Sequence, residues 1–329
     1  MSSTHDTAGF GWGIAATGSI AETVGRVIAA EPGMRVAAVG SRDKDRAVDL
    51  AGRLGAAAAF GSYEEMVADP AVEAVYVATP HTRHRHVVDL AIAAGKAVLC
   101  EKPLAATLAE AEAMVARARE ADVFLMEAMW MRFNPLIRRV TDAVADGAIG
   151  EPRSLSASFG FPLPYDAQHR LWNRALGGGA LLDLGVYPVA LAQLLFGTPD
   201  SVATVGALAP NGVDAEAALL LGWPGGARAL LETSLVSFLP MTATVIGTAG
   251  RIDIDPPFHA ATTITVRPDG TLPQEFRIDG AEQAYAAELR EVRDLVRAGR
   301  IESPTMPHDA TLAVLRTLER ARTTLGVVA

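Results

Sequence analysis

The sequence predicts an α/β protein made of two domains. Its 329 residues are enough for two ordinary domains, each with a core of its own. The first 126 residues alternate short β-rich runs with helical patterns, which is typical of a parallel sheet with crossover helices. After Glu127 the pattern changes to successive strands with tight-turn signals. We therefore expect one domain over residues 1–126 and a second over residues 127–329.

Six β-rich runs in the first half are expected to form the strands of one sheet. They are Phe10–Ala15, Arg35–Gly40, Ala57–Phe60, Glu73–Ala78, Ala97–Cys100 and Val123–Met126. Between them lie amphipathic stretches such as Ala47–Leu54 and Leu108–Ala121, in which apolar residues recur every three or four positions among charged ones. Six strands joined by helices favour a doubly wound parallel sheet of the Rossmann type, which binds nucleotides.

The second half is expected to be an α+β domain with a mostly antiparallel, open sheet that carries its helices on one face. Strands follow one another from Arg153 to Ile278, and Pro224-Gly225-Gly226 and Pro268-Asp269-Gly270 mark tight turns. Helices are indicated at Pro135–Ala145, which the Asp146-Gly147 pair closes, after Gly177-Gly178-Gly179 to about Leu195, at Gln283–Arg297 and at His308–Thr324.

The composition excludes several classes of protein. A net charge of −9 argues against binding to nucleic acid or to an anionic membrane. No uninterrupted apolar run reaches eighteen residues, and residues 1–8 lack the basic and apolar regions of an export signal, so a cytoplasmic protein with no membrane span is expected. The single cysteine, Cys100, can form no internal disulfide, and no histidine spacing indicates a metal site, so none is expected.

The first strand leads into a turn of small residues, Ala16-Thr17-Gly18-Ser19-Ile20-Ala21. A dinucleotide fold requires such a turn, because the backbone approaches the pyrophosphate there. Gly18 stands at the middle position, where a side chain would collide with phosphate, and Ala21 fits the third position. Ala16 replaces the usual first glycine, so the motif is degraded. The alternative interpretation is an ordinary small-residue turn between a strand and a helix.

The residues after the second strand bear on the choice of cofactor. An NAD site has Asp or Glu at this point to bind the ribose hydroxyls. Here the strand ends in Gly40-Ser41-Arg42, and Arg42 and Ser41 can bind a 2′-phosphate, which favours NADP over NAD. Asp43 complicates this interpretation, although we expect the next helix to use it near its N-terminus. Arg42 is otherwise a solvated loop charge.

Two polar segments follow the fourth and fifth strands. Thr79, Pro80 and His84 come after the fourth, and Glu101 and Lys102 come after the fifth. Ligands bind open α/β sheets at the carboxyl ends of parallel strands, so both segments are candidates for the site. The chain has only two other lysines, Lys44 and Lys96, so Lys102 does not belong to a lysine-rich solvated surface.

Several motifs resemble the glucose-fructose oxidoreductase, inositol dehydrogenase and rhizopine-catabolism (Gfo/Idh/MocA) family. The resemblance rests on the turn from Ala16 to Ala21, on Thr79-Pro80 and on Glu101-Lys102-Pro103, and it covers nearly the whole chain. Within the family, two segments are similar to the branch of dimeric dihydrodiol dehydrogenases and NADP-dependent D-xylose dehydrogenases. They are Met126-Glu127-Ala128-Met129-Trp130-Met131-Arg132-Phe133 and Gly177-Gly178-Gly179-Ala180-Leu181-Leu182-Asp183-Leu184-Gly185-Val186-Tyr187-Pro188.

The resemblance implies roles for individual residues. Lys102 matches the catalytic lysine, and Asp183 and Tyr187 match a pair on one helix, where a spacing of four gives them a common face. A nearby lysine cation would lower the pKa of a buried tyrosine and make it a general base. The resemblance also places Glu101 and Lys102 at the cofactor and His84 beside the nicotinamide. Trp130, Arg132 and Trp172 are expected to line the substrate pocket, and the alternative for the tryptophans is an ordinary place in the core. It further implies a homodimer or homotetramer that assembles through the open sheet.

The function expected from these observations is an NADP-dependent oxidoreductase. It would transfer hydride between nicotinamide C4 and a ring hydroxyl or carbonyl of a sugar or cyclic diol. Two alternatives within the same family are an NAD-dependent glycosidase, which would favour a histidine at position 187, and a non-catalytic NADP-sensing regulator, which usually lacks the lysine. The short-chain dehydrogenases are excluded, because no tyrosine is followed by lysine at the spacing they require.

Overall fold

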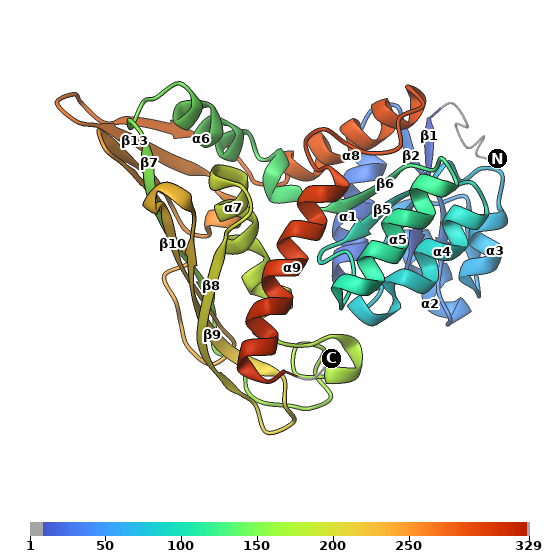
Figure 1. Cartoon of the computed structure of the whole chain (residues 1–329). Coiled ribbons are helices and arrows are strands. Elements are labelled where there is room, and N and C mark those ends of the chain that lie inside the picture. The colour runs from blue at the N-terminus through green and yellow to red at the C-terminus, as the bar shows by residue number, and fades with distance from the viewer. Residues whose placement is uncertain (1–8, 328–329) are drawn as a thin grey trace. The chain divides into compact units, whose positions relative to one another are not determined.

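A computed structural model of the protein describes residues 9–327, and its backbone contacts divide into two compact units (Figure 1). Among the described residues, the first unit comprises 9–105, 109–129 and 285–308, and the second comprises 106–108, 130–284 and 309–327. Residues 1–8, where no export signal is expected, lie outside the described part. The late segment 285–308 thus belongs to the first unit, although the change of pattern in the sequence occurs near residue 127.

The first unit contains a six-stranded parallel sheet, as predicted. Its spatial order is β3-β2-β1-β4-β5-β6. The strands are β1 (Phe10–Ala15), β2 (Met34–Gly40), β3 (Ala58–Phe60), β4 (Ala74–Val77), β5 (Ala97–Glu101) and β6 (Leu125–Ala128). Except in the edge strand β3, whose residues are half-buried, their side chains are almost all buried, because helices cover both faces of a doubly wound sheet. The order reverses between β1 and β4, the point at which such sheets bind ligands.

The helices of the first unit alternate with its strands. They are α1 (Ser19–Ala30), α2 (Lys44–Leu54), α3 (Tyr63–Ala68), η1 (His81–Arg83), α4 (His84–Ala93), α5 (Leu108–Glu120) and, from the late segment, α8 (Gln283–Arg297). Strand β6 begins two residues later than predicted. The backbone N–H of Val123 still bonds to Ala118, and Asp122 takes a positive φ of 54°, so the end of α5 extends over the predicted start of the strand.

The second unit contains an eight-stranded, mostly antiparallel sheet, which confirms the predicted fold class. Its order is β14-β13-β12-β11-β7-β10-β9-β8, and the parallel pair is β7 with β10. The strands are β7 (Pro152–Gly160), β8 (Ser201–Leu208), β9 (Asp214–Gly222), β10 (Arg228–Ser234), β11 (Ala243–Gly247), β12 (Gly250–Ile254), β13 (Thr263–Pro268) and β14 (Gln274–Arg277). The two predicted turn signals lie between β9 and β10 and between β13 and β14.

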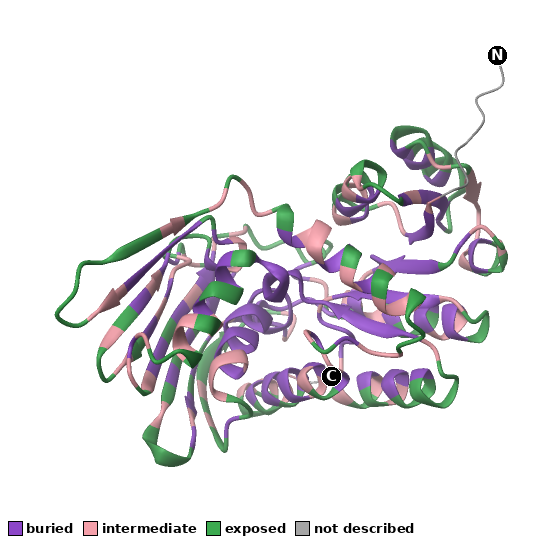
Figure 2. Ribbon diagram, turned by 90° about the horizontal axis from the view of Figure 1, so that it is seen from above, coloured by how far each residue is buried: buried purple, intermediate pink, exposed green. Residues whose placement is uncertain are grey.

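Helices cover one face of this sheet, and the other face is open (Figure 1). The strands accordingly alternate buried and exposed residues (Figure 2). The helical segments are η2 (Trp130–Phe133), α6 (Pro135–Ala145), η3 (Arg174–Leu176), the π-helical η4 (Leu181–Gly185), α7 (Val186–Phe196), η5 (Pro224–Gly226), η6 (Phe258–Ala260) and α9 (His308–Leu325). Arg174–Phe196 is long and apolar enough to span a membrane by composition, but 83% of its most apolar window is buried, as in a core helix.

Candidate active site

The turn after β1 has the geometry of a phosphate-binding loop. Ala16 takes a positive φ of 108°, which is rare for a residue with a side chain and explains why glycine is usual there. Gly18 precedes α1, and no side chain in the described part of the chain caps this helix end. A Cβ at Gly18 would meet no described atom within 4 Å, so packing alone does not require glycine. The free amides of the first turn and the open space beside them fit a bound phosphate.

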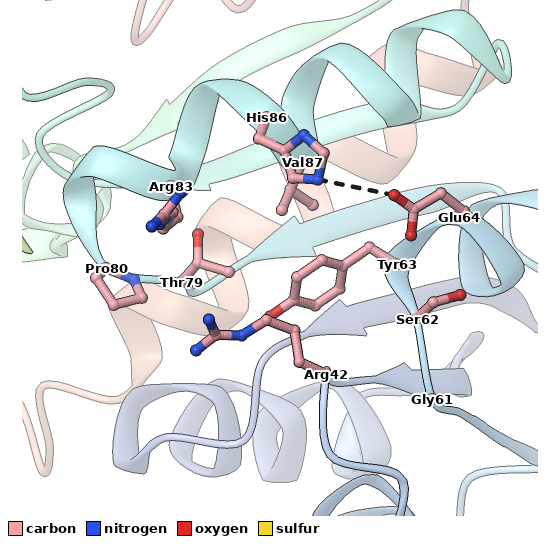
Figure 3. A pocket seen from close by; sticks show the side chains of 10 residues that line it. All are labelled: Arg42, Gly61, Ser62, Tyr63, Glu64, Thr79, Pro80, Arg83, His86 and Val87. Carbon is pink, nitrogen blue, oxygen red and sulfur yellow. Dashed lines mark ion pairs between the residues drawn. The ribbon is translucent and has the colours of Figure 1, made fainter.

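A pocket of about 340 Å³ lies in the same unit, close to the end of β2 (Figure 3). Its lining comes from the segments that follow β2, β3 and β4, and from the start of α4. The residues that line it are Arg42, Gly61, Ser62, Tyr63, Glu64, Thr79, Pro80, Arg83, His86 and Val87. The structure therefore brings together three of the residues expected at the cofactor, Arg42, Thr79 and Pro80.

The sequence interpretation missed Tyr63, Arg83 and His86 in this pocket. Burial raises the pKa of the Tyr63 phenol, and the charge of Arg42 opposes this. His86 lies 3.7 Å from Glu64 in an ion-pair geometry (Figure 3). Arg83 could have been found from its place in the loop after β4, three residues beyond Pro80. Tyr63 follows β3, and only the parallel order of the strands brings it beside Arg42.

Asp43 is used by helix α2, as predicted. Its carboxylate accepts hydrogen bonds from the backbone N–H groups of Asp45 at 3.0 Å and Arg46 at 3.2 Å. The Asp43 N–H in turn bonds to the hydroxyl of Ser41 at 3.2 Å, and Ser41 is buried. Asp43 is therefore an N-cap, a role that stabilises the helix and holds the carboxylate at its amides.

His84 is fully buried and connects the two loops predicted to contribute to the site. Its Nε2 lies 2.8 Å from the carbonyl oxygen of Thr79, and its Nδ1 lies 3.1 Å from that of Pro103. Burial lowers the pKa of His84 to about 4, although the contacts with backbone carbonyls raise it. A neutral His84 has one N–H and donates to only one of these carbonyl oxygens at a time, and its ring lies between the loop after β4 and the loop after β5.

Lys102 stands in a loop that buried carboxylates shape. The hydroxyl of Tyr76 donates to the carboxylate of Glu101, which also accepts the backbone N–H of Lys102 at 3.2 Å. Glu127 accepts the N–H of Leu104 at 2.9 Å. Both glutamates are more than nine-tenths buried, whereas Lys102 is half-buried. The two carboxylates fix the backbone around Lys102 and leave its side chain partly accessible.

In the second unit, a π-helical turn carries Asp183 and leads into α7. The sequence predicts an uninterrupted α-helix here, but Leu181–Gly185 is π-helical, a feature common at functional sites. The buried carboxylate of Asp214 on β9 holds the turn by accepting the N–H of Leu181 at 2.5 Å. A Cβ at Gly179 would lie 2.4 Å from this carboxylate, which explains the last glycine of the triplet. Burial raises the pKa of Asp214 to about 6.

Asp183 pairs with Arg170, a residue that the sequence interpretation missed. The guanidinium Nη1 lies 2.8 Å from Oδ1 of Asp183. Asp183 is buried and Arg170 is exposed. The ion pair fixes the position of the Asp183 carboxylate, whose oxygens can accept hydrogen bonds from hydroxyl groups.

Tyr187, which belongs to α7, lies in a cluster of aromatic side chains that come from other elements of the same unit. Its phenolic oxygen accepts a hydrogen bond of 2.9 Å from the indole N–H of Trp130. The ring centres of Phe159 and His259 lie 5.8 Å and 4.7 Å from that of Tyr187. The structure therefore joins two of the predicted residues, Trp130 and Tyr187, and adds two that the sequence gave no reason to select.

Trp172 and Arg132, the other two residues expected in the substrate pocket, have no ring contact or hydrogen bond to Tyr187 among those described above. Trp172 is almost fully buried, and its indole N–H donates to the carbonyl oxygen of Pro164 at 3.1 Å. Its ring contacts that of Tyr165 at 5.5 Å, so Trp172 closes the loop between β7 and η3. Arg132 is buried in η2 beside Trp130.

Comparison with known proteins identifies the family of the chain. Residues 10–129 match the model of an oxidoreductase family with an NAD-binding Rossmann fold, and residues 137–253 match the GFO/IDH/MocA C-terminal domain. Trans-1,2-dihydrobenzene-1,2-diol dehydrogenase from mouse (Mus musculus) is 39% identical over 96% of this chain and 97% of its own. The chain belongs to the Gfo/Idh/MocA oxidoreductase family. The human (Homo sapiens) enzyme of the same name is 37% identical over the same shares.

Solved structures of other oxidoreductases share the fold of this family member. Aldose-aldose oxidoreductase from Caulobacter crescentus, complexed with glycerol, superposes with a TM-score of 0.88 at 27% identity, over 97% of this chain and 98% of its own. A 3-ketoreductase from Actinomadura kijaniata, with NADP and TDP-benzene, gives a TM-score of 0.84 at 29% identity, over 96% and 97%. This Gfo/Idh/MocA protein is thus an NAD(P)-dependent dehydrogenase or reductase with a small-molecule substrate.

Proposed function

We propose that the protein is an NADP-dependent dehydrogenase or reductase that acts on a ring hydroxyl or carbonyl of a cyclic diol or a sugar. The observation that carries this proposal is the phenolic oxygen of Tyr187, buried among aromatic rings and bonded to the indole of Trp130. Aromatic side chains suit the apolar faces of a ring, and a phenol can exchange a proton with its hydroxyl. The names of the diol dehydrogenases and the aldose oxidoreductase support the same substrate classes.

The charge of the pocket after β2 supports NADP as the cofactor. Arg42 and Arg83 bring two cations to the pocket, and Ser41 lies beside Arg42. Asp43, the carboxylate nearest the strand end in sequence, is bonded to the amides of α2. Glu64 also lines the pocket, but its carboxylate contacts His86. A 2′-phosphate carries a charge that this pocket complements, whereas a ribose hydroxyl does not.

The protein would hold this cofactor with the turn Ala16-Thr17-Gly18-Ser19-Ile20 at its phosphates and with Arg42 at its adenosine end. When bound, the nicotinamide supplies hydride transfer at C4. In oxidation, Tyr187 accepts the proton of the substrate hydroxyl, and in reduction it returns a proton to the carbonyl oxygen. Lys102 orients this oxygen and stabilises its developing negative charge. Asp183, held by Arg170, binds a second hydroxyl of the substrate.

We also propose that the protein forms a homodimer or homotetramer through the open face of its eight-stranded sheet. Large apolar side chains are exposed on this face, including Val205 on β8, Leu220 on β9 and Leu230 on β10. Leu220 and Leu230 are direct cross-strand neighbours, so they form one continuous apolar area. Exposed patches of this kind are typical of interfaces between subunits. Light scattering should therefore give two or four times the mass of the chain, and Leu230→Lys should lower it.

A panel of trans-cyclic diols, aldoses and polyols, each offered with NADP⁺ and with NAD⁺, tests the proposed activity. Formation of reduced nicotinamide is followed by its absorbance. We expect turnover with a diol or an aldose, and a higher kcat/KM with NADP⁺. Absence of turnover with every diol and sugar would contradict the substrate class, and a preference for NAD⁺ would contradict the choice of cofactor.

A further inference from the structure

Trp130 and Tyr187 meet through a hydrogen bond that is shielded from water. The indole N–H donates to the phenolic oxygen at 2.9 Å, and the two rings meet edge to face with centres 6.4 Å apart. Both residues are less than a tenth exposed. Trp130 belongs to η2 and Tyr187 to α7, so the contact joins segments that are 57 residues apart in the sequence.

The position of Trp130 is fixed by the residue that begins the next helix. Asn134 is fully buried, and its side-chain oxygen accepts the N–H of Leu136 at 2.8 Å, which caps α6. The amide nitrogen of the same side chain donates to the carbonyl oxygen of Ala261 at 2.9 Å. This bond ties the residue after η2 to the residue after η6, and the ring of His259, within η6, has its centre 5.9 Å from that of Trp130.

The phenol ring of Tyr187 is held from the other side. His259 lies nearly parallel to Phe159, with their ring centres 4.2 Å apart, and both rings contact Tyr187. The phenol ring therefore has little freedom to rotate away from the indole. The direction of its O–H bond is the main remaining variable, and a donor on the oxygen restricts that direction.

We propose that Trp130 is a positioning residue for Tyr187. Its N–H occupies one lone pair of the phenolic oxygen, directs the hydroxyl away from the indole, and stabilises the phenolate that accepts the substrate proton. The proton moves between the substrate oxygen and Tyr187, and Trp130 keeps its own hydrogen throughout. This proposal rests on the proposed function, in which Tyr187 is the base. It gives the Trp130 indole a role other than lining the substrate pocket.

Other charged groups near Tyr187 define the alternatives. Asp183 lies one turn earlier on the same helical segment and pairs with Arg170, and His259 contacts the phenol ring. Arg132 stands two residues after Trp130 in η2. Protonated His259 would also stabilise a phenolate. The variants below therefore include His259→Phe, which keeps a ring in the cluster and removes the imidazole.

The test compares pH–rate profiles of substrate oxidation in Trp130→Phe and the wild type. Phenylalanine keeps an aromatic ring and removes the N–H. We expect the alkaline limb to move up by roughly one to two pH units, as loss of one hydrogen bond to a charged group implies, with cofactor affinity unchanged. Trp223→Phe is the matched control, because its indole N–H bonds to the carbonyl oxygen of Gly197 at 2.9 Å, and its limb should not move.

Two results would overturn the proposal. One is a pH–rate profile of Trp130→Phe whose alkaline limb stays at the wild-type pH. The other is an alkaline limb that moves in His259→Phe but not in Trp130→Phe. Tyr187→Phe separates this test from that of the proposed function: if this variant keeps the limb, the assigned base is wrong, whatever Trp130 does.

A measurement on the wild-type protein covers the case in which Trp130→Phe fails to fold. In protein labelled with ¹⁵N at tryptophan, one indole N–H signal should shift as Tyr187 ionises, and this titration should be absent from Tyr187→Phe. If no indole signal titrates along the alkaline limb, Trp130 does not bond to the ionising phenol.

Discussion

The candidate site residues are exposed and charged in the pocket of the first unit, whereas those of the second unit are buried and aromatic. In the first unit, the pocket after β2 is lined by Arg42, Arg83 and His86, which are charged or titratable and exposed. In the second unit, Tyr187 and Trp130 are buried among aromatic rings and meet through one hydrogen bond. A change of charge in the first region should therefore alter binding and leave packing intact. Removal of one polar atom in the second should alter the chemical step.

Lys102→Met is expected to have the largest effect. Lys102 is in the first unit, yet the proposed mechanism gives it a part in the chemical step. Removal of its ammonium group should lower kcat by at least about 10²-fold, the lower limit for loss of an acid–base group, and NADP affinity is measured alongside because the resemblance also places Lys102 at the cofactor. Steady-state kinetics and calorimetric titration of NADP measure the two quantities. A loss confined to cofactor affinity would assign Lys102 to binding, with Arg42.

His84 should make the first unit sensitive to acid. Its pKa is about 4 in the folded protein and near 6.5 in the unfolded chain, so below pH 6.5 the unfolded chain binds a proton that the folded one does not. The free energy of unfolding should therefore fall by about 3 kcal/mol as the pH drops from 6.5 to 4. Denaturant titrations between pH 6.5 and 4 should show that the free energy of unfolding falls less steeply in His84→Asn than in the wild type.

His86→Asn is the control for this effect, because the side chain of His86 is 60% exposed. In His86→Asn, the free energy of unfolding should fall with decreasing pH as steeply as it does in the wild type. A His84→Asn variant with the wild-type slope would show that other groups govern stability in acid. Asp214 in the second unit acts in the opposite direction, since its raised pKa favours the folded state as the pH falls below about 6.

Arg42→Ala should change cofactor choice without affecting the base. Loss of a charged hydrogen bond to the 2′-phosphate should weaken NADP binding by roughly 1.5–3 kcal/mol, about 10- to 150-fold. NAD binding should be nearly unchanged, because NAD lacks this phosphate. Fluorescence titration of both cofactors measures the difference. Arg53→Ala provides the comparison, as Arg53 is an exposed arginine of the same unit that does not line the pocket, and equal losses for NADP and NAD in Arg42→Ala would contradict the assignment.

Local signals in the sequence were sufficient to predict much of the fold and part of the site. Asp43 was expected near the N-terminus of a helix and caps α2, because capping depends only on the next three residues. Tyr63 was missed, since the parallel order of the strands brings it to Arg42 from a distant segment, whereas Arg83 stands in the loop after β4 that the sequence already indicates. The sequence contains Trp130 and Tyr187 as separate signals, but their hydrogen bond depends on the packing of η2 against α7. The π-helical turn at Leu181–Gly185 depends on Asp214, more than thirty residues away.

The most direct test of the account is the pH–rate profile of substrate oxidation by NADP⁺ in the wild type and in Tyr187→Phe. This substitution removes one oxygen and keeps the ring in its aromatic cluster, so the fold should be preserved. The account predicts a rate that rises with pH along an alkaline limb in the wild type. In Tyr187→Phe, kcat should fall by about 10²–10⁴-fold and the limb should disappear, with NADP affinity little altered. Wild-type turnover with the same limb in Tyr187→Phe would contradict it.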